Sequence, residues 1–482
     1  MSQYSYRSSA NKSNLFSTMF SDSDIAKHFS CGKTKCAYLI SFGIAPCFKE
    51  MLSNVLNGVT HYVALFDESY NKVTKNGQMD IHIRFWDPTE NIVKTRYWTS
   101  EFLGKASAND LSEKFCNGIA KLAQSKLIQI SSDGPNVNLA FLKIIKEKRI
   151  EEELPHLITI GTCGLHTLHG SFKCGENASG WNLKKTLSSA YKIFDESPSR
   201  RADFENLTET TLSEYPLQFC SHRWVENERV AKKARLIWPK IVEIIKYWKQ
   251  LPKSKQPGKG KAGANTSYDH LCSAVEDPLI QVKLLYFERI ASQLNSFLVT
   301  FQSDNPMAPF LVESIEEVLR GLCGMVIRKG TLEKATTTYK FLNIDLNDPV
   351  NHKSIDKIDL GFAVNYEIQQ LKQKNKINNS QINTFKQDAQ KFIVSLCSHA
   401  MDKSPMYYIF ARCLKCLSPH IWQSVLNLVK QCLKNFFLKW HHIKPYRVKW
   451  QMLQSLNFPN FYPQLFEIID MRLLNLIRIL KD

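Results

Sequence analysis

Five segments in the first 161 residues have an apolar pattern that predicts β-strands. They are residues 61–66, 79–86, 95–104, 127–131 and 157–161. The second segment, MDIHIRFW, alternates apolar and polar positions, which is typical of a strand with one buried face. The first, HYVALF, and the last, LITIG, are short apolar runs rich in residues that favour strands. We therefore expect a sheet in this part of the chain.

Helical periodicity separates the later strands. In residues 107–123, leucine, phenylalanine and isoleucine recur at intervals of three and four positions and share one helix face. A second helix is expected at about 136–148, and a third after the fifth strand. The order of elements is therefore strand, strand, strand, helix, strand, helix, strand, helix.

That order restricts the topology of the sheet. Strand four reaches the sheet through a helical crossover, which makes it a parallel neighbour. The simplest arrangement pairs it with strand one, as in the mixed five-stranded sheet of a ribonuclease-H-like α/β core. Asp67 and Asp133 each follow one of these two strands, so we expect their side chains to meet, although 133 − 67 = 66 positions separate them.

From about Trp224 onwards the pattern is helical, with few strand signals. The clearest helical segments are 229–251, 278–301 and 421–440, and the breaks are a Pro/Gly/Lys-rich loop at 251–270 and a polar stretch at 371–384. A length of 482 residues predicts two or three domains. We expect a flexible polar leader (1–24), the α/β core (25–224) and an all-helical domain (225–482).

The charge balance favours a polyanionic partner. The chain has 63 Lys and Arg against 45 Asp and Glu, a formal net charge of +18. Cations that neutralise phosphates release counterions and so favour nucleic-acid binding, although a basic, solvated surface is the alternative interpretation.

The 13 cysteines lack disulfide-framework spacing and no secretory segment opens the chain, which predicts reduced thiols in a protein that is not exported. No uninterrupted apolar run approaches the roughly 18 to 20 residues of a membrane span, so we expect no membrane association.

Two carboxylates at adjacent strand ends suit a divalent cation. At about 4 Å and an effective dielectric near 20, their repulsion is roughly 4 kcal/mol. A bound cation removes that repulsion, and oxygen-only ligands with open positions suit Mg²⁺ or Mn²⁺. The alternative is structural: Asp67 caps a turn, and Asp133 is an ordinary residue of a Asp-Gly-Pro turn.

Several motifs in order resemble the hAT superfamily of cut-and-paste DNA transposases, and animal proteins descended from them in particular. They are FDESYNK (66–72), MDIHIRFWD (79–87), QISSDGPNVN (129–138), IGTCGLHTLHGSFKCG (160–175) and FCSHRW (219–224). The similarity runs from about residue 25 to 250. It implies a ribonuclease-H-like core interrupted by a helical insertion domain.

The resemblance also implies roles for particular residues. Asp67 matches the first catalytic acid of the family and Asp133 the second. Cys163 and His166 match its CxxH motif. Arg223 and Trp224 match its RW element, whose tryptophan lies near the DNA end and holds an extruded base, in keeping with base stacking on an aromatic face. A tryptophan at a domain junction is equally suited to a place in the core.

The third acid of the family, a late glutamate, is not identifiable. The last glutamate, Glu467, lies in YPQLFEIID, which does not resemble the family context, and the carboxy-terminal dimerisation segment is not recognisable. A zinc site drawn from Cys413 and Cys416 with His420, His441 and His442 is less well supported than buried thiols and surface histidines.

Three functions follow. The first is a transposase-derived nuclear protein, catalytically incomplete, that binds DNA or protein partners through the retained scaffold. The second is an active transposase that hydrolyses phosphodiesters and transfers strands with Mg²⁺ or Mn²⁺. The third is an interaction protein that uses its helical domain. The nuclear location rests on the resemblance; without it the cytoplasm is expected.

Overall fold

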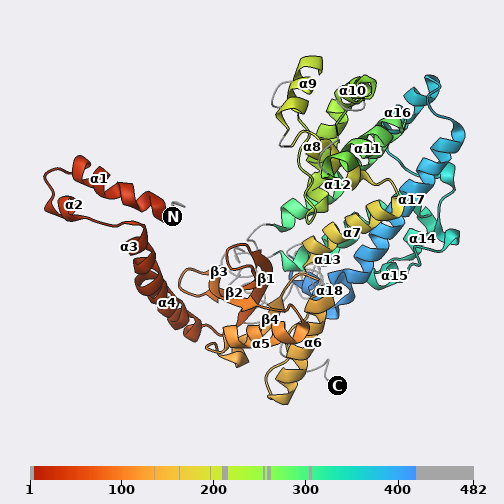
Figure 1. The fold of residues 1–482 in the computed structure, drawn as a ribbon. Coiled ribbons are helices and arrows are strands. Elements are labelled where there is room, and N and C mark those ends of the chain that lie inside the picture. Colours follow the sequence, from red (N-terminus) through yellow and green to blue (C-terminus); the bar gives the residue numbers. More distant parts are fainter. Residues whose placement is uncertain are drawn as a thin grey trace, which may run out of the picture. The chain divides into compact units, whose positions relative to one another are not determined.

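The structure is a computed structural model that describes residues 5–134, 136–161, 163–195, 197–208, 215–252, 256–257, 262–302 and 307–418. Residues 1–415 form one compact unit, and the elements discussed below lie in it (Figure 1). The predicted helix at 421–440 and Glu467 lie outside the described residues, as do His420, His441 and His442.

The described part contains one four-stranded mixed sheet. Its strands are β1 (Tyr62–Asn71), β2 (Asn76–Asp87), β3 (Ile92–Leu103) and β4 (Leu127–Ser131), in the order β3-β2-β1-β4. The first three form an antiparallel meander, and β4 pairs with β1 in parallel. The predicted crossover is thus confirmed, with α5 (Ala108–Ile119) between β3 and β4 and α6 (Asn136–Glu151) after β4.

Residues 157–161, predicted as a fifth strand, are not a strand in the structure. They lie beside β4, where the Ile158 N–H donates to the Ile128 carbonyl at 2.8 Å. The buried guanidinium of Arg149 donates to the carbonyls of Leu127 and Pro155, so it holds this segment beside β4 through the side chain of α6. One backbone bond is too few for a ladder, and the apolar residues of LITIG are only partly buried.

Residues 1–24 were predicted as a flexible leader, but residues 10–19 are helical. The N-terminal elements are η1 (Tyr6–Ser9), α1 (Ala10–Met19), α2 (Asp24–His28), α3 (Lys33–Tyr38), η2 (Leu39–Ile44) and α4 (Ala45–Gly58). Ser23 caps α2 by accepting the Ala26 N–H at 3.3 Å. By length and composition, the helix over residues 33–58 is the one among the described residues that could cross a membrane.

The remaining described elements are helical, apart from one isolated bridge between Ile327 and His352. The α-helices are α7 (Gly164–Ser179), α8 (Leu183–Lys192), α9 (Pro198–Thr208), α10 (Glu228–Gln250), α11 (Ala262–Glu276), α12 (Ile280–Phe301), α13 (Ala308–Val326), α14 (Lys329–Lys334), α15 (Thr338–Leu342), α16 (Phe362–Gln373), α17 (Asn379–Lys403) and α18 (Ile409–Cys413). The short 3-10 turns are η3 (Gln124–Lys126), η5 (Trp224–Asn227), η6 (Pro349–Asn351), η7 (Ile355–Lys357), η8 (Pro405–Tyr407) and η9 (Leu414–Leu417). The loop predicted at 251–270 is shorter than expected, because α11 begins at Ala262. The break predicted at 371–384 exists but is shorter, because α16 ends at Gln373 and α17 begins at Asn379 with a capping box of Asn378 and Gln381.

The unit contains two separate hydrophobic cores, which we call the sheet core and the helical core. The sheet core runs in sequence from Leu56 to Ile145, where α5 and α6 cover one face of the sheet. The helical core begins at Leu168 on α7 and continues to Ala411. The change of core therefore comes between Ile145 and Leu168, well before the domain boundary expected at residue 224. Helix α7 joins the helical core because its small residue Gly175 lets α17 approach closely.

Candidate active site at the carboxyl edge of the sheet

The parallel pairing of β1 with β4 brings the two predicted aspartates to one edge. Leu65 pairs with Ser131, the last residue of β4, and Asp67 and Asp133 each follow two positions later. Asp133 thus lies just beyond the end of β4, where Asn138 on α6 donates a hydrogen bond to its carboxylate. Asp67 is exposed and Asp133 is partly buried. Both aspartates act electrostatically on Glu68 and on His166, so they share their surroundings.

A further acid, Asp80, lies next to this pair and was missed in the sequence. It is the direct partner of Asp67 in the antiparallel β1–β2 register. Gln78 Nε2 donates to Asp80 Oδ1 at 2.7 Å, and the hydroxyl of Ser100 on β3 donates to the same oxygen. The signal was available, since Asp80 occupies a polar position of the alternating segment MDIHIRFW. Asp67 and Asp80 are therefore opposite each other on β1 and β2, and Asp133 follows the end of β4.

Glu68 and Asn138 lie beside these aspartates. We call the group of Asp67, Glu68, Asp80, Asp133 and Asn138 the acidic edge. Asn138 on α6 is 1% exposed and its Nδ2 donates to Asp133 Oδ1 at 2.5 Å. Burial raises the pKa of Glu68, and the charge of Asp133 raises it further, while a hydrogen bond from Asn138 partly offsets both. The amide of Asn138 thus serves two carboxylates. Its Oδ1 is buried without a hydrogen-bond partner among the described residues.

The CxxH motif lies beside the second aspartate. Cys163 immediately precedes α7, and its N–H donates to the Ser132 carbonyl at 3.4 Å. Burial raises the pKa of the Cys163 thiol, but hydrogen bonds from His166 and the positive charge of its ring outweigh burial and lower it. The hydrogen bond that the ring donates to Cys163 raises the pKa of His166 against the effect of burial, and the charges of Cys163, Asp133 and Asp67 add to the increase. The pair is therefore biased towards thiolate and imidazolium, and the helix N-terminus favours the thiolate.

The donor chemistry of this edge fits a hard divalent cation. Carboxylate oxygens are the ligands that Mg²⁺ and Mn²⁺ prefer, and Mg²⁺ is commonly held by one or two carboxylates, with water or phosphate oxygens filling the other positions. Within the described ranges, no three His, Cys, Asp or Glu side chains are grouped as an all-protein metal site would require. Asp67 and Asp133 would therefore be the protein ligands.

The RW element is anchored to α7 rather than placed at the acidic edge. Trp224 is 2% exposed and belongs to the helical core, where its ring makes an edge contact with Phe219. The ring therefore offers no free face for a base in this conformation, which agrees with the core interpretation. Arg223 is largely exposed and pairs with Glu226 at 3.2 Å.

His169, one turn along α7 from His166, fixes the position of the RW element. Its Nδ1 accepts the Val225 N–H at 3.2 Å. Burial lowers the pKa of His169 to about 4, which keeps the ring neutral and able to accept that bond.

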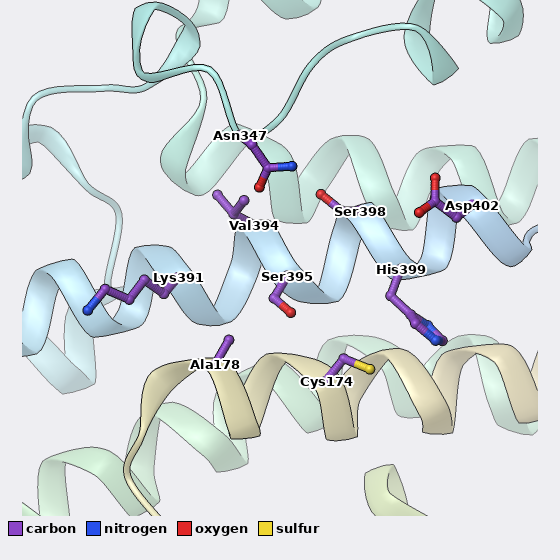
Figure 2. Close-up of a pocket in the computed structure, with 9 residues that line it drawn as sticks. All are labelled: Cys174, Ala178, Asn347, Lys391, Val394, Ser395, Ser398, His399 and Asp402. Atoms are coloured by element: carbon purple, nitrogen blue, oxygen red, sulfur yellow. The ribbon is translucent and has the colours of Figure 1, made fainter.

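A cavity of about 450 Å³ lies between α7 and α17 (Figure 2). Its lining is polar and mixed: Cys174, Ala178, Asn347, Lys391, Val394, Ser395, Ser398, His399 and Asp402. His399 bonds the hydroxyl of Ser171, which is fully buried and also donates to the Thr167 carbonyl. This serine is therefore not an accessible nucleophile, and the cavity contains none of the residues of the acidic edge.

The zinc interpretation gains no support from the described residues. The thiol of Cys413 is free and exposed, whereas the other ligands drawn for that site, the side chain of Cys416 among them, lie outside the described part. No family model and no curated protein matches the sequence.

Proposed function

We propose that this protein descends from a hAT-superfamily transposase, lacks a complete catalytic triad and acts as a nuclear nucleic-acid-binding protein. One observation carries the proposal: β1 and β4 pair in parallel as far as Leu65 and Ser131, and Asp67 and Asp133 each follow two positions after that pair. The position of Cys163 beside Ser132 supports it, because the CxxH motif then adjoins the acidic edge. The net charge of +18 supports a polyanionic partner.

Active metal-dependent cleavage is the second candidate. The cross-strand pair of Asp67 and Asp80 favours it, together with the electrostatic effect of both Asp67 and Asp133 on His166, because neighbouring carboxylates attract a divalent cation. When bound, that cation would polarise a phosphodiester and stabilise the attacking and leaving oxygens. Asp67 and Asp133 would hold the cation, while Asn138 would keep the Asp133 carboxylate in position through its hydrogen bond.

Nucleic-acid binding is tested by fluorescence anisotropy with a labelled duplex at increasing salt. We expect the logarithm of the affinity to fall linearly with the logarithm of the salt concentration. Arg223→Ala should reduce that slope by about one if its guanidinium contacts a phosphate. Lys329→Ala is the matched control, since Lys329 is likewise exposed and paired to an acid on the next helical turn. An affinity independent of salt would instead favour a protein-interaction role.

Metal binding is tested by the thermal unfolding midpoint with and without Mn²⁺. We expect Mn²⁺ to raise the midpoint of the wild type and to leave Asp67→Ala/Asp133→Ala unchanged. A shift that persists in the double variant would exclude the proposed ligands. Cleavage of a labelled oligonucleotide, lost in the same variant, would replace the incomplete-enzyme proposal with the active one.

A further inference from the structure

The N-terminal arm, defined here as residues 33–58, presents a large apolar surface to solvent. Helices α3, η2 and α4 follow one another as one continuous helical rod (Figure 1). In its most apolar stretch of 18 residues, only 6% of the positions are buried. Tyr38, Phe42 and Phe48 are 61%, 76% and 55% exposed. Soluble proteins rarely leave such a contiguous patch uncovered, so a partner surface is expected here.

The uncharged part of the arm is shorter than a membrane span. Residues 36–48 carry no charge, which gives about 20 Å of helix against a hydrocarbon thickness of about 30 Å. The following turns are held by the protein: Lys49 Nζ lies 5.1 Å from the centre of the Trp98 ring, and Leu56 is buried in the sheet core. An uncharged run of this length is typical of a helix buried in a protein core.

We propose that the arm is covered by the arm of a second copy of this chain. Its three aromatic rings alone leave roughly 400 Å² in water, taking about 200 Å² for each fully exposed ring. Leu39, Ile44 and Met51, each at least half exposed, bring the patch towards the ~800 Å² per partner of a stable interface. An uncharged contact also lets two copies of a strongly basic chain approach each other without repulsion between like charges inside the interface.

The charges that flank the apolar run fit an antiparallel pair. Lys35 and Glu50 lie equally far from the point between Phe42 and Gly43. A two-fold axis at that point sets Lys35 of one copy level with Glu50 of the partner subunit, and the reverse pair forms at the other end. Glu50 makes no ion pair with the described residues of its own chain, and it is the one acid in the arm.

The mass of the full chain in solution tests the pairing, by light scattering coupled to size exclusion. We expect twice the 55.5 kDa chain mass for the wild type. Phe42→Glu should weaken dimerisation at least tenfold, whereas the matched control Val73→Glu should not, because Val73 is 91% exposed outside the arm. Unchanged circular dichroism in both variants would show that they fold.

A charge exchange tests the register and identifies the occupant. Lys35→Glu and Glu50→Lys should each weaken the dimer several-fold, and the double variant should recover it, since the pairs are re-formed with reversed sign. Wild-type protein that stays monomeric at all concentrations overturns the proposal, whether the arm then binds phospholipid vesicles or folds back on its own chain. A dimer that Phe42→Glu does not weaken also overturns it, and absence of recovery overturns the antiparallel register.

Discussion

Asp67 on β1 and Asp80 on β2 are direct cross-strand partners, so two like charges lie opposite each other on the two central strands of the sheet. Like charges in this position destabilise a pair of strands by roughly 0.2–1 kcal/mol. The hydrogen bonds from Gln78 and Ser100 stabilise Asp80, while Asp67 accepts the N–H of Glu68 at 3.0 Å. A sheet that keeps this arrangement is less stable than it could be, which is typical of a functional site.

Replacing Asp67 by asparagine should therefore stabilise the metal-free protein. With a chelator present, we expect Asp67→Asn to raise the free energy of unfolding by about 0.5 kcal/mol, because the repulsion from Asp80 is removed. Chemical denaturation followed by circular dichroism measures the change. The exposed acid Glu317 on α13 provides the control, Glu317→Gln. A loss of stability in Asp67→Asn would mean that its bond to the Glu68 N–H outweighs the repulsion.

His169 should make the fold sensitive to acid. The neutral ring has a pKa lowered to about 4 by burial, whereas the unfolded chain binds the proton near pH 6.5. The contribution of His169 to the free energy of unfolding is therefore complete above pH 6.5. As the pH falls towards 4, the free energy of unfolding decreases by about 3 kcal/mol. His169→Gln, which keeps an acceptor for the Val225 N–H, should lose less over this range. His222→Gln should follow the wild type; if His169→Gln does so too, the ring is not held neutral.

The contact of α7 with α17 should depend on Gly175. A Cβ atom at this position would lie 2.7 Å from the Phe392 carbonyl oxygen and 3.0 Å from Leu396 Cβ. We expect Gly175→Ala to lower the free energy of unfolding by about 1–3 kcal/mol, because backbone has to move. Gly170→Ala on the same helix is the control, since its nearest contact would be 3.5 Å from His399 Cε1. Equal stability of the two variants in urea would contradict this packing.

Cys163 should react faster with iodoacetamide than Cys174. His166 lowers the pKa of the Cys163 thiol, while burial raises that of Cys174. The thiolate is the nucleophile, so alkylation of Cys163 near pH 7, followed by mass spectrometry, should slow several-fold in His166→Ala. Lys173→Ala is a control on the same helix. If the rate at Cys163 is indifferent to His166, the two side chains do not interact in solution.

The sheet was largely predictable because buried and more exposed positions alternate along β1 and β2. Alternation in β2, and the crossover before β4, were enough to predict that β4 pairs with β1 in parallel. The segment 157–161 was misjudged because an apolar run does not record the hydrogen bonds of a ladder. The side chain of Arg149 on the preceding helix, which donates to the Leu127 and Pro155 carbonyls, could not be placed from the pattern. The cross-strand partner of Asp67 needed the register of β1 on β2, which pattern alone does not supply.

The helical half was predictable in its elements but not in its division from the sheet. Periodicity locates α7 and α10 without showing which core they join, and it placed the boundary near Trp224 instead of before Leu168. The place of Trp224 itself was open, since a tryptophan serves a core and a base-binding surface equally well. Burial by Phe219 and the helical core resolves that choice for this conformation.

Helix α7 begins at the carboxylates and ends deep among the helices. Its first turn carries His166, whose pKa is raised in part by the charges of Asp67 and Asp133. Its later turns pack closely against α17 at Gly175. Because one helix carries both features, a substitution near Gly175 that displaces α7 would also displace His166 relative to the two aspartates.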